Sequence, residues 1–276
     1  MLSFVEVAAR PEYTVTAVTC RDDHRNWSVA EAHDSFRVVI VRQGRFRRRT
    51  GGVCADLDPT VAYLGVPGQE ERFAHPAGGD VCTSVTLAPA LWRALAGDTQ
   101  RVRPTIYVDA QADLAHRRVV AAARTGDVDF ALTEQLLKLM SHAITQAVTE
   151  PTPAGANTAG GNRPLVEAAR ELIGADHPAA GGLLPLAALL GVSPYRLSRA
   201  FTGELGVSLT RYRNRVRVAR ALDRLAAGEP RLGVLAADLG FADQAHLCRT
   251  LRAHVGHTPT GLRRLLTQPA AALPVG

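Results

Sequence analysis

Two stretches of the chain, residues 186–206 and 232–256, share one pattern, and this repetition constrains the fold more than any other feature. In each stretch an apolar helical run ends at a glycine, which favours the left-handed backbone found just after a helix. A polar residue, Ser193 in the first stretch and Asp243 in the second, then caps a second helix. The sequence therefore predicts two helix-turn-helix units of similar construction, separated by a long helix over Ser208–Ala226.

The second helix of each unit divides into an inner and an outer face. Apolar residues at three- and four-residue steps predict that Leu197 and Phe201 face inward in the first unit, and Leu247 and Leu251 in the second. The outer faces carry polar or small side chains, which we take as candidate DNA-binding residues because such a helix fits the major groove. They are Tyr195, Arg196, Ser198, Arg199, Gln244, Ala245, His246, Cys248 and Arg249.

Two of these arginines are the leading candidates for contact with bases or phosphates. Arg199 and Arg249 align to within one residue when Gly191 is matched with Gly240. An arginine can donate two parallel hydrogen bonds to guanine in the major groove. The alternative to DNA contact for the charged candidates is that they form a solvated surface. The small candidates only need to let the helix approach the DNA closely. For His246 the alternative is a role in helix packing.

Charge is distributed unevenly along the chain. Residues 1–161 contain 17 Lys+Arg and 18 Asp+Glu, whereas residues 162–276 contain 15 Lys+Arg and 8 Asp+Glu. A basic segment beside a near-neutral one indicates either a polyanionic partner for the basic segment or a solvated basic surface. The long helix is crowded with arginines that either reach phosphates or form a solvated face. These are Arg211, Arg213, Arg215, Arg217 and Arg220.

The segment Pro151–Pro164 marks a boundary, because it is rich in proline, glycine and alanine and lacks apolar periodicity. We expect a first domain over residues 1–150, a linker over residues 151–163 and an all-helical domain over residues 164–268. The helices predicted in the last domain cover Leu165–Ile173, Leu184–Leu190, Pro194–Leu205, Ser208–Ala226, Arg231–Leu239, Asp243–Val255 and Thr260–Leu266.

The first domain begins with short runs, bounded by glycine, proline or aspartate, that predict an antiparallel sandwich or small barrel. The predicted strands are Phe36–Val41, Arg45–Arg49, Val53–Leu57, Val61–Leu64 and Val81–Leu87. We expect the basic run Arg45–Arg49 to be an exposed hairpin tip, and the alternative is a second contact with an anionic partner. Helices follow over Ala90–Leu95, Ala112–Ala123 and Asp129–Val148. The apolar stripe of the last helix either packs on the sheet or pairs with a second subunit.

The helical domain resembles the AraC/XylS family of bacterial transcription regulators over residues 165–266. The resemblance rests on GVSPYRLSRAFTGELGVS in the first unit and GFADQAHLCRTLRAHVGHTP in the second. It implies two recognition helices in adjacent major grooves on one face of double-stranded promoter DNA, with RNA polymerase as a further partner. The chain has leucine at 209, 247 and 262, where the family usually has proline, phenylalanine and tyrosine.

The first domain resembles, more weakly, the cupin-like β-barrel that members of this family often carry before a set of dimerisation helices. The resemblance rests on residues 57–80, with a turn at Pro67 and Gly68. It implies an α+β chain with a cupin-like antiparallel β-barrel and a helical hairpin before the helix-turn-helix domain. It also implies a homodimer and a small organic effector, whose binding residues the sequence leaves unknown.

The sequence indicates no catalytic or metal site, and we expect no cofactor. His75 stands alone, whereas metal-dependent cupins combine several histidines with a glutamate. Cys82 is either a thiol that binds a soft metal or senses oxidants, or a buried strand cysteine. A DNA-repair enzyme fused to this kind of DNA-binding domain needs a cluster of four cysteines near its N-terminus. The first domain has only Cys20, Cys54 and Cys82, which are far apart in the sequence. A domain that only self-associates is the third alternative to an effector-responsive regulator.

The chain contains no apolar stretch long enough to span a bilayer, and its first residues lack the basic start of a secretory signal. We therefore expect a cytoplasmic protein with no membrane partner.

Overall fold

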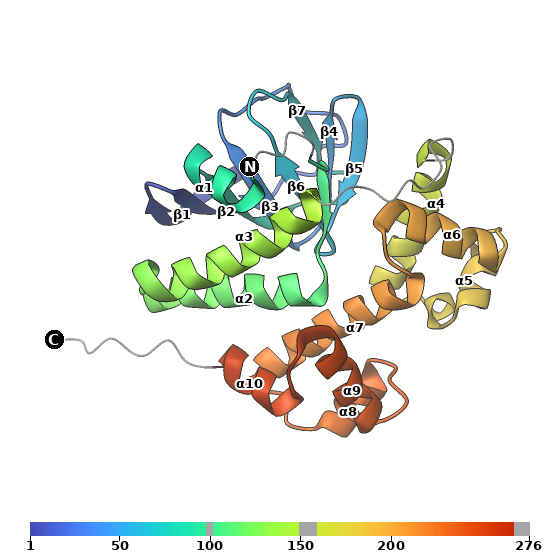
Figure 1. Cartoon of the computed structure of the whole chain (residues 1–276). Coiled ribbons are helices and arrows are strands. Elements are labelled where there is room, and N and C mark those ends of the chain that lie inside the picture. The colour runs from blue at the N-terminus through green and yellow to red at the C-terminus, as the bar shows by residue number, and fades with distance from the viewer. Residues whose placement is uncertain (98–101, 149–158, 268–276) are drawn as a thin grey trace. The chain divides into compact units, whose positions relative to one another are not determined.

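The computed structural model describes residues 1–97, 102–148 and 159–267. Two compact units divide the chain, one within Met1–Glu150 and the other within Pro151–Ala272 (Figure 1). Residues 151–158 of the predicted linker lie outside the described residues. Among the helices of the described ranges, none is both long and apolar enough to cross a membrane.

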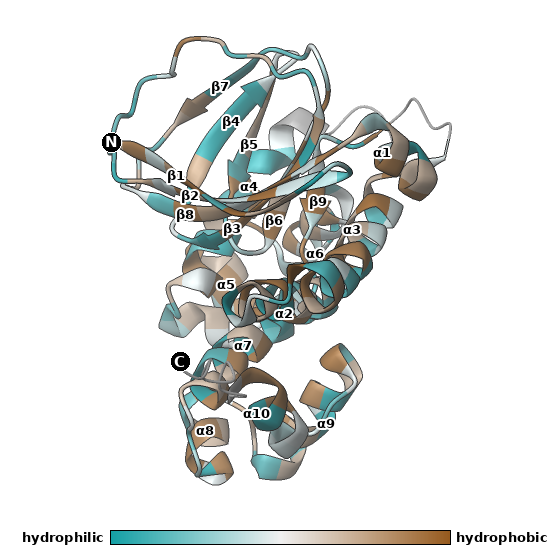
Figure 2. Ribbon diagram, turned by 90° about the vertical axis from the view of Figure 1, so that its left-hand side faces the viewer, coloured by the Kyte–Doolittle hydropathy of each residue, from teal (hydrophilic) through white to brown (hydrophobic). Residues whose placement is uncertain are grey.

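The first unit contains an antiparallel six-stranded sheet in the order β1-β2-β8-β3-β6-β9 and a three-stranded sheet in the order β5-β4-β7. Its strands are β1 (Leu2–Arg10), β2 (Tyr13–Cys20), β3 (Phe36–Gln43), β4 (Phe46–Thr50), β5 (Val53–Leu57), β6 (Val61–Gly65), β7 (Glu71–Ala74), β8 (Asp80–Leu87) and β9 (Thr105–Tyr107). Figure 2 shows the two sheets as separate layers. The described strands pair into two antiparallel sheets and do not form one closed barrel, which agrees with the sandwich of the two predicted alternatives.

Helices cover the outer face of the larger sheet. They are α1 (Pro89–Ala96), α2 (Ala110–Thr125) and α3 (Thr133–Val148), with a π-helical turn over Val128–Leu132 before α3. The predicted stripe on α3, including Leu136, Leu139 and Met140, is fully buried in one core with strand residues such as Val38 and Val85. The hairpin therefore packs on the sheet, as the first of the two alternatives predicted, and this stripe is not available to a second subunit.

The second unit is all helical. Its helices are α4 (Ala159–Gly174), α5 (Leu183–Leu189), α6 (Pro194–Leu205), α7 (Leu209–Ala226), α8 (Leu232–Asp238), α9 (Gln244–Val255) and α10 (Pro259–Thr267), with a 3-10 turn over Pro178–Gly181. All the predicted helices are present. The predicted linker is wrong over residues 159–163, because α4 already begins at Ala159 and continues through Pro164.

The long helix α7 packs with a face that differs from the predicted one. The spacing of apolar residues along this helix predicts a buried stripe of Leu209, Tyr212, Val216, Ala219, Leu222 and Leu225. Of these, Leu209, Tyr212, Leu222 and Leu225 are buried. The middle of the buried face is formed by Arg215 and Val218, together with Ala221, whereas Val216 and Ala219 are only half-buried. Apolar spacing alone does not predict the middle of the buried face of α7, because an arginine, Arg215, is buried there.

Candidate nucleic-acid interface and ligand cavity

The two helix-turn-helix units are built by matching caps. In the first, α5 ends before Gly191 at φ 66°, and Ser193 Oγ accepts a hydrogen bond from the backbone N–H of Arg196. In the second, α8 ends before Gly240 at φ 68°, and the Asp243 carboxylate accepts from the backbone N–H of His246. Because only glycine adopts these positive φ values without strain, the turns depend on it.

The second helices of the two units are equivalent residue by residue. Each has 12 residues and ends at a glycine in the left-handed conformation, φ 72° after α6 and φ 75° after α9. Since α6 begins at Pro194 and α9 at Gln244, Arg199 and Arg249 are both sixth residues. Both arginines are exposed, as the alignment predicted.

The inner faces confirm the predicted core. Four side chains of these faces are completely buried: Leu197 and Phe201 of α6, and Leu247 and Leu251 of α9. Phe201 also packs edge-on against Tyr212 of α7, with ring centroids 5.0 Å apart. Each recognition helix is thus fixed through its inner face, which leaves its outer face open.

The outer face of α6 begins with a paired tyrosine and arginine. Tyr195 is 71% exposed, and the Arg199 guanidinium lies 5.6 Å from the centroid of its ring. Arg199 also donates a hydrogen bond to the Tyr195 hydroxyl over 3.4 Å. Arg196 is exposed and Ser198 half-buried on the same helix. This arrangement pre-orders a cation and a hydroxyl at the surface of the first unit.

The outer face of α9 is less uniform. Gln244, Ala245 and Arg249 are exposed, whereas Cys248 is half-buried. His246 is also half-buried; its ring packs edge-on against Phe241 with centroids 5.4 Å apart, and Nδ1 accepts from the Ala242 N–H over 3.3 Å. These contacts give His246 the helix-packing role that the sequence left as an alternative to DNA contact.

The arginines of α7 separate into different roles. Arg215 is buried, so its assignment as a phosphate contact or solvated side chain is wrong. Arg217 lies 5.6 Å from the ring centroid of Phe241, and burial lowers the pKa of its guanidinium. Arg220 binds Asp176 and the carbonyl oxygen of Gly174. Arg211 is exposed near the start of the helix.

The first unit encloses a cavity of about 390 Å³ between its two sheets. Its wall is apolar along one part, where Val39, Phe46 and Phe73 contribute, and polar near His75 and Asp80. Phe4 and Val29 also line the cavity and are 64% and 84% exposed, so they lie where it opens to solvent. An apolar cavity with a few convergent polar groups is the usual form of a small-molecule site.

A buried ion cluster joins the two sheets beside this cavity. The carboxylate of Glu71 on β7 binds the guanidinium groups of Arg37 on β3 and Arg48 on β4. Arg48 also donates to the carbonyl oxygen of Leu64 over 3.1 Å and lies 4.4 Å from the ring centroid of Tyr63. The prediction that residues 45–49 form an exposed tip is therefore wrong for Arg48, which is 1% exposed.

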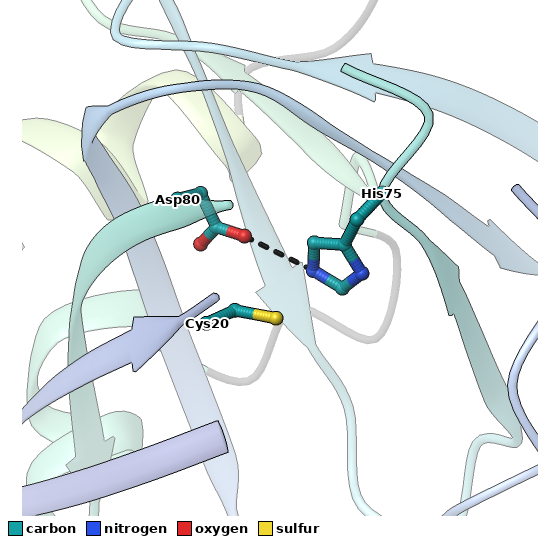
Figure 3. A group of neighbouring side chains, drawn as sticks. All are labelled: Cys20, His75 and Asp80. Carbon is teal, nitrogen blue, oxygen red and sulfur yellow. Dashed lines mark ion pairs between the residues drawn. The ribbon is translucent and has the colours of Figure 1, made fainter. Parts of the chain in front are cut away.

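The structure also brings together three side chains that the sequence did not connect. Cys20, His75 and Asp80 are buried, and their ligand atoms all lie within 4.8 Å of one another (Figure 3). Cys20 and Asp80 are direct partners across β2 and β8, whereas His75 follows β7 of the other sheet. Because the grouping depends on strand register, no local motif could have revealed it.

Cys82 is the buried strand cysteine of the two alternatives. Its thiol donates to Asp80 Oδ2 over 2.9 Å, and burial raises its pKa far above the ordinary value, with Asp80 adding to the effect. A thiol that stays protonated is a poor nucleophile and a poor sensor of oxidants. The partner of His75 is Asp80 and not Cys82: His75 Nε2 lies 3.0 Å from Asp80 Oδ1.

Two capped helix-turn-helix units joined by one helix, in the part of the chain that carries its excess positive charge, are typical of a DNA-binding protein of the helix-turn-helix class. Residues 186–265 match a family model described as a helix-turn-helix domain, of the AraC type. The chain therefore contains a helix-turn-helix domain of the AraC type over these residues.

No curated protein sequence matches the chain. Among solved structures, ToxT from Vibrio cholerae O395 is 11% identical with a TM-score of 0.38, covering 94% of this chain and 100% of that chain. The C-terminal domain of AraT, a response regulator from Geobacillus stearothermophilus, is 29% identical with a TM-score of 0.35, covering 37% and 84%. A cupin superfamily protein from Desulfitobacterium hafniense DCB-2 is 14% identical with a TM-score of 0.28, covering 32% and 77%.

Proposed function

We propose that the outer faces of α6 and α9 read the bases of one promoter site and that the cavity of the first unit binds the effector that controls this activity. The observation that carries the first part is the equivalence of Arg199 and Arg249, which are exposed sixth residues of matching helices. Because side chains at one helical position project in the same way, both arginines can present the same fork to guanine.

The other predicted residues have different parts in the proposal. Tyr195, Arg196 and Gln244 supply hydrogen-bonding groups at the exposed start of each helix. Ser198, Ala245 and Cys248 are small side chains that let the helix backbone approach the base edges. His246 holds the start of α9 through its contacts with Phe241 and Ala242.

The helix α7 sets the distance between the two reading helices. It has 18 residues and therefore spans about 27 Å at 1.5 Å per residue. Successive major grooves on one face of DNA lie about 34 Å apart, which suits two recognition helices that flank such a spacer. The expected site thus has two short motifs about one helical turn apart.

The test begins with the full-length protein and a random DNA library, from which the bound sequences are selected. Arg199→Ala and Arg249→Ala are each expected to lower affinity for the selected site by about 5- to 150-fold, since a bidentate base contact contributes about 1–3 kcal/mol. The double variant should lose roughly the product of the two factors, because the sites are separate. Affinity of the unaltered protein should also fall steeply with salt.

The matched control is Arg231→Ala, which removes one positive charge from an exposed arginine at the start of α8 and beside Glu229. It should change affinity by no more than about twofold. Unchanged binding by the double variant at physiological salt would overturn the assignment of the reading face.

For the effector, we propose a small organic molecule with an apolar body and a polar end. The apolar part of the cavity wall and the exposed Phe4 and Val29 at its opening fit the body, and Arg37, His24 and His75 line the polar part. A bound effector should raise the melting temperature of the first unit, because ligands stabilise the state that binds them.

A library of apolar carboxylic acids, phenols and amides is the probe for this part of the proposal. Val29→Asp should abolish the thermal shift without unfolding the unit, because Val29 is 84% exposed. The matched control, Leu184→Asp, alters an exposed leucine of the second unit and should leave the shift intact. An identical shift in Val29→Asp would place the ligand elsewhere.

The remaining parts of the proposal concern partners. We infer that the regulator acts in the cytoplasm as a homodimer, contacts RNA polymerase and has no enzymatic activity. Because the stripe on α3 is covered by the chain's own sheet, the dimer would have to use another surface of the first unit. Sedimentation of the full chain at increasing concentration tests the dimer, and a persistent monomer would exclude it.

A further inference from the structure

We propose that Cys20, His75 and Asp80 bind a divalent transition-metal ion of the zinc type in the wall of the cavity. The three side chains point toward one another from the two sheets (Figure 3). All three line the cavity, and each is less than 9% exposed. Thiolate, imidazole and carboxylate are the ligand types that zinc takes in proteins, and three protein ligands leave a fourth position for water or another ligand.

The hydrogen bonds of two histidines prepare a ring nitrogen of His75 for a metal. His24 Nδ1 lies 3.0 Å from the carbonyl oxygen of Asn26, which can only accept, so Nδ1 carries the proton. In the neutral His24 ring, Nε2 then accepts, and it lies 3.2 Å from His75 Nδ1. His75 therefore donates through Nδ1, and its neutral ring presents the lone pair of Nε2. A histidine held in this way by its other nitrogen is the usual arrangement of a metal ligand.

Within the described part of the chain, the carboxylate oxygen opposite this nitrogen lacks a hydrogen-bond donor, whereas the other oxygen, Oδ2, accepts from the Cys82 thiol. Asp80 Oδ1 is buried and, among the described residues, accepts no hydrogen bond, although His75 Nε2 lies only 3.0 Å away. The two atoms, joined by the dashed line in Figure 3, form an ion pair only if His75 is doubly protonated, and no N–H of the ring points at the oxygen in hydrogen-bond geometry. A lone pair and a carboxylate oxygen at this distance repel each other unless a cation lies between them.

The spacing of the three ligand atoms suits one ion. Zinc–nitrogen and zinc–oxygen bonds of about 2.0–2.1 Å and a zinc–sulfur bond of about 2.3 Å place the ligand atoms of a tetrahedral site roughly 3.3–3.6 Å apart. The observed 3.0 Å between His75 Nε2 and Asp80 Oδ1, and the 4.8 Å limit for the whole group, require only small side-chain movements.

The backbone holds the cysteine and the aspartate at this spacing. Cys20 and Asp80 are direct cross-strand partners, so their side chains lie on the same face of the sheet. A Cβ atom on Gly79 would lie 2.2 Å from the Cys20 carbonyl oxygen, so only glycine lets the two strands approach here. The donor set also favours zinc over the iron of oxygenases, which takes two histidines and a carboxylate.

The experiment uses the full-length protein, freed of metal by a chelator and titrated with Co²⁺ and then Zn²⁺. One equivalent of Co²⁺ should give a thiolate-to-metal charge-transfer band, and Zn²⁺ should displace it. Cys20→Ser should remove the band, and His75→Ala or Asp80→Asn should lower affinity at least tenfold. His24→Asn, which changes a positioning residue, should lower affinity about 10- to 100-fold while the band of the saturated site persists.

The matched control is Cys54→Ser, which removes a thiol of β5 that does not line the cavity and should leave the band and its stoichiometry unchanged. Circular dichroism of each variant shows whether it is folded. X-ray absorption of the zinc-loaded, unaltered protein adds a measurement that requires no variant, and one sulfur neighbour is expected. No bound ion, a band that survives Cys20→Ser in a folded protein, or a metal without a sulfur neighbour would overturn the site.

Discussion

The buried histidine of α2 should make the first unit sensitive to mild acid. His116 is 4% exposed, and its Nε2 lies 2.9 Å from the Thr83 hydroxyl oxygen. Burial lowers the pKa of this imidazole to about 4, although the nearby Asp113 carboxylate opposes the shift. The folded state therefore keeps His116 neutral under conditions in which the unfolded chain, with a histidine pKa near 6.5, binds a proton.

The sign and size of the effect follow from this difference in proton binding. Because the unfolded state binds more protons between about pH 4 and 6.5, the free energy of unfolding is highest above this window and falls as the pH is lowered through it. The loss from this one group is about 2 kcal/mol at pH 5 and approaches about 3 kcal/mol near pH 4. His116→Gln should lack this contribution.

The two tryptophans make the measurement specific to the first unit. Trp27 and Trp92 are the only tryptophans of the chain, and both lie in this unit. Urea unfolding followed by tryptophan fluorescence at about pH 7 and pH 5 therefore reports its stability within the intact protein. The urea midpoint should fall by about 1 M more in the unaltered protein than in His116→Gln, for a slope near 2 kcal/mol per molar. Equal falls in both proteins would refute the buried, neutral histidine.

Two further stability predictions test the assembly of each unit. Glu71→Ala should lower the free energy of unfolding of the first unit by about 3–5 kcal/mol, because it leaves the buried Arg48 without its carboxylate; the exposed Glu70→Ala is the control in the same urea experiment. In α6, Gly203→Ala should stabilise the second unit by about 0.5–1 kcal/mol, since it adds a methyl group to open space in an exposed helical turn. Gly206→Ala should destabilise the same unit by about 1 kcal/mol, because the φ angle of Gly206 is 72°. Thermal melts in which both glycine variants shift the melting temperature in the same direction would contradict this account.

The helical unit could be predicted from sequence because its signals are local. Ser193 and Asp243 cap their helices as predicted, and the glycines after α6 and α9 adopt the left-handed conformation. The prediction failed where a distant residue decides the outcome. Arg48 lies in a basic run that is typical of an exposed hairpin, but it alternates inward on β4 and meets Glu71 from another strand.

The same distinction explains what the sequence showed of the two sites. The reading face follows from one helical period, so Arg199 and Arg249 could be matched without a structure. The group of Cys20, His75 and Asp80 depends on the register of β2 with β8 and on how the second sheet faces the first. Neither property is encoded in the spacing of these residues along the chain.

The equivalence of α6 and α9 in backbone, but not in side chains, has a consequence for how the regulator is oriented on a promoter. Tyr195 of the first helix corresponds to Ala245 of the second, so under the proposed function the two helices present different side chains to the bases. A single protein molecule that reads DNA in the proposed way would bind an asymmetric sequence and lie on it in one direction only. Inverting that sequence would turn the bound molecule end for end, and a surface that faced the start of transcription would then face away from it.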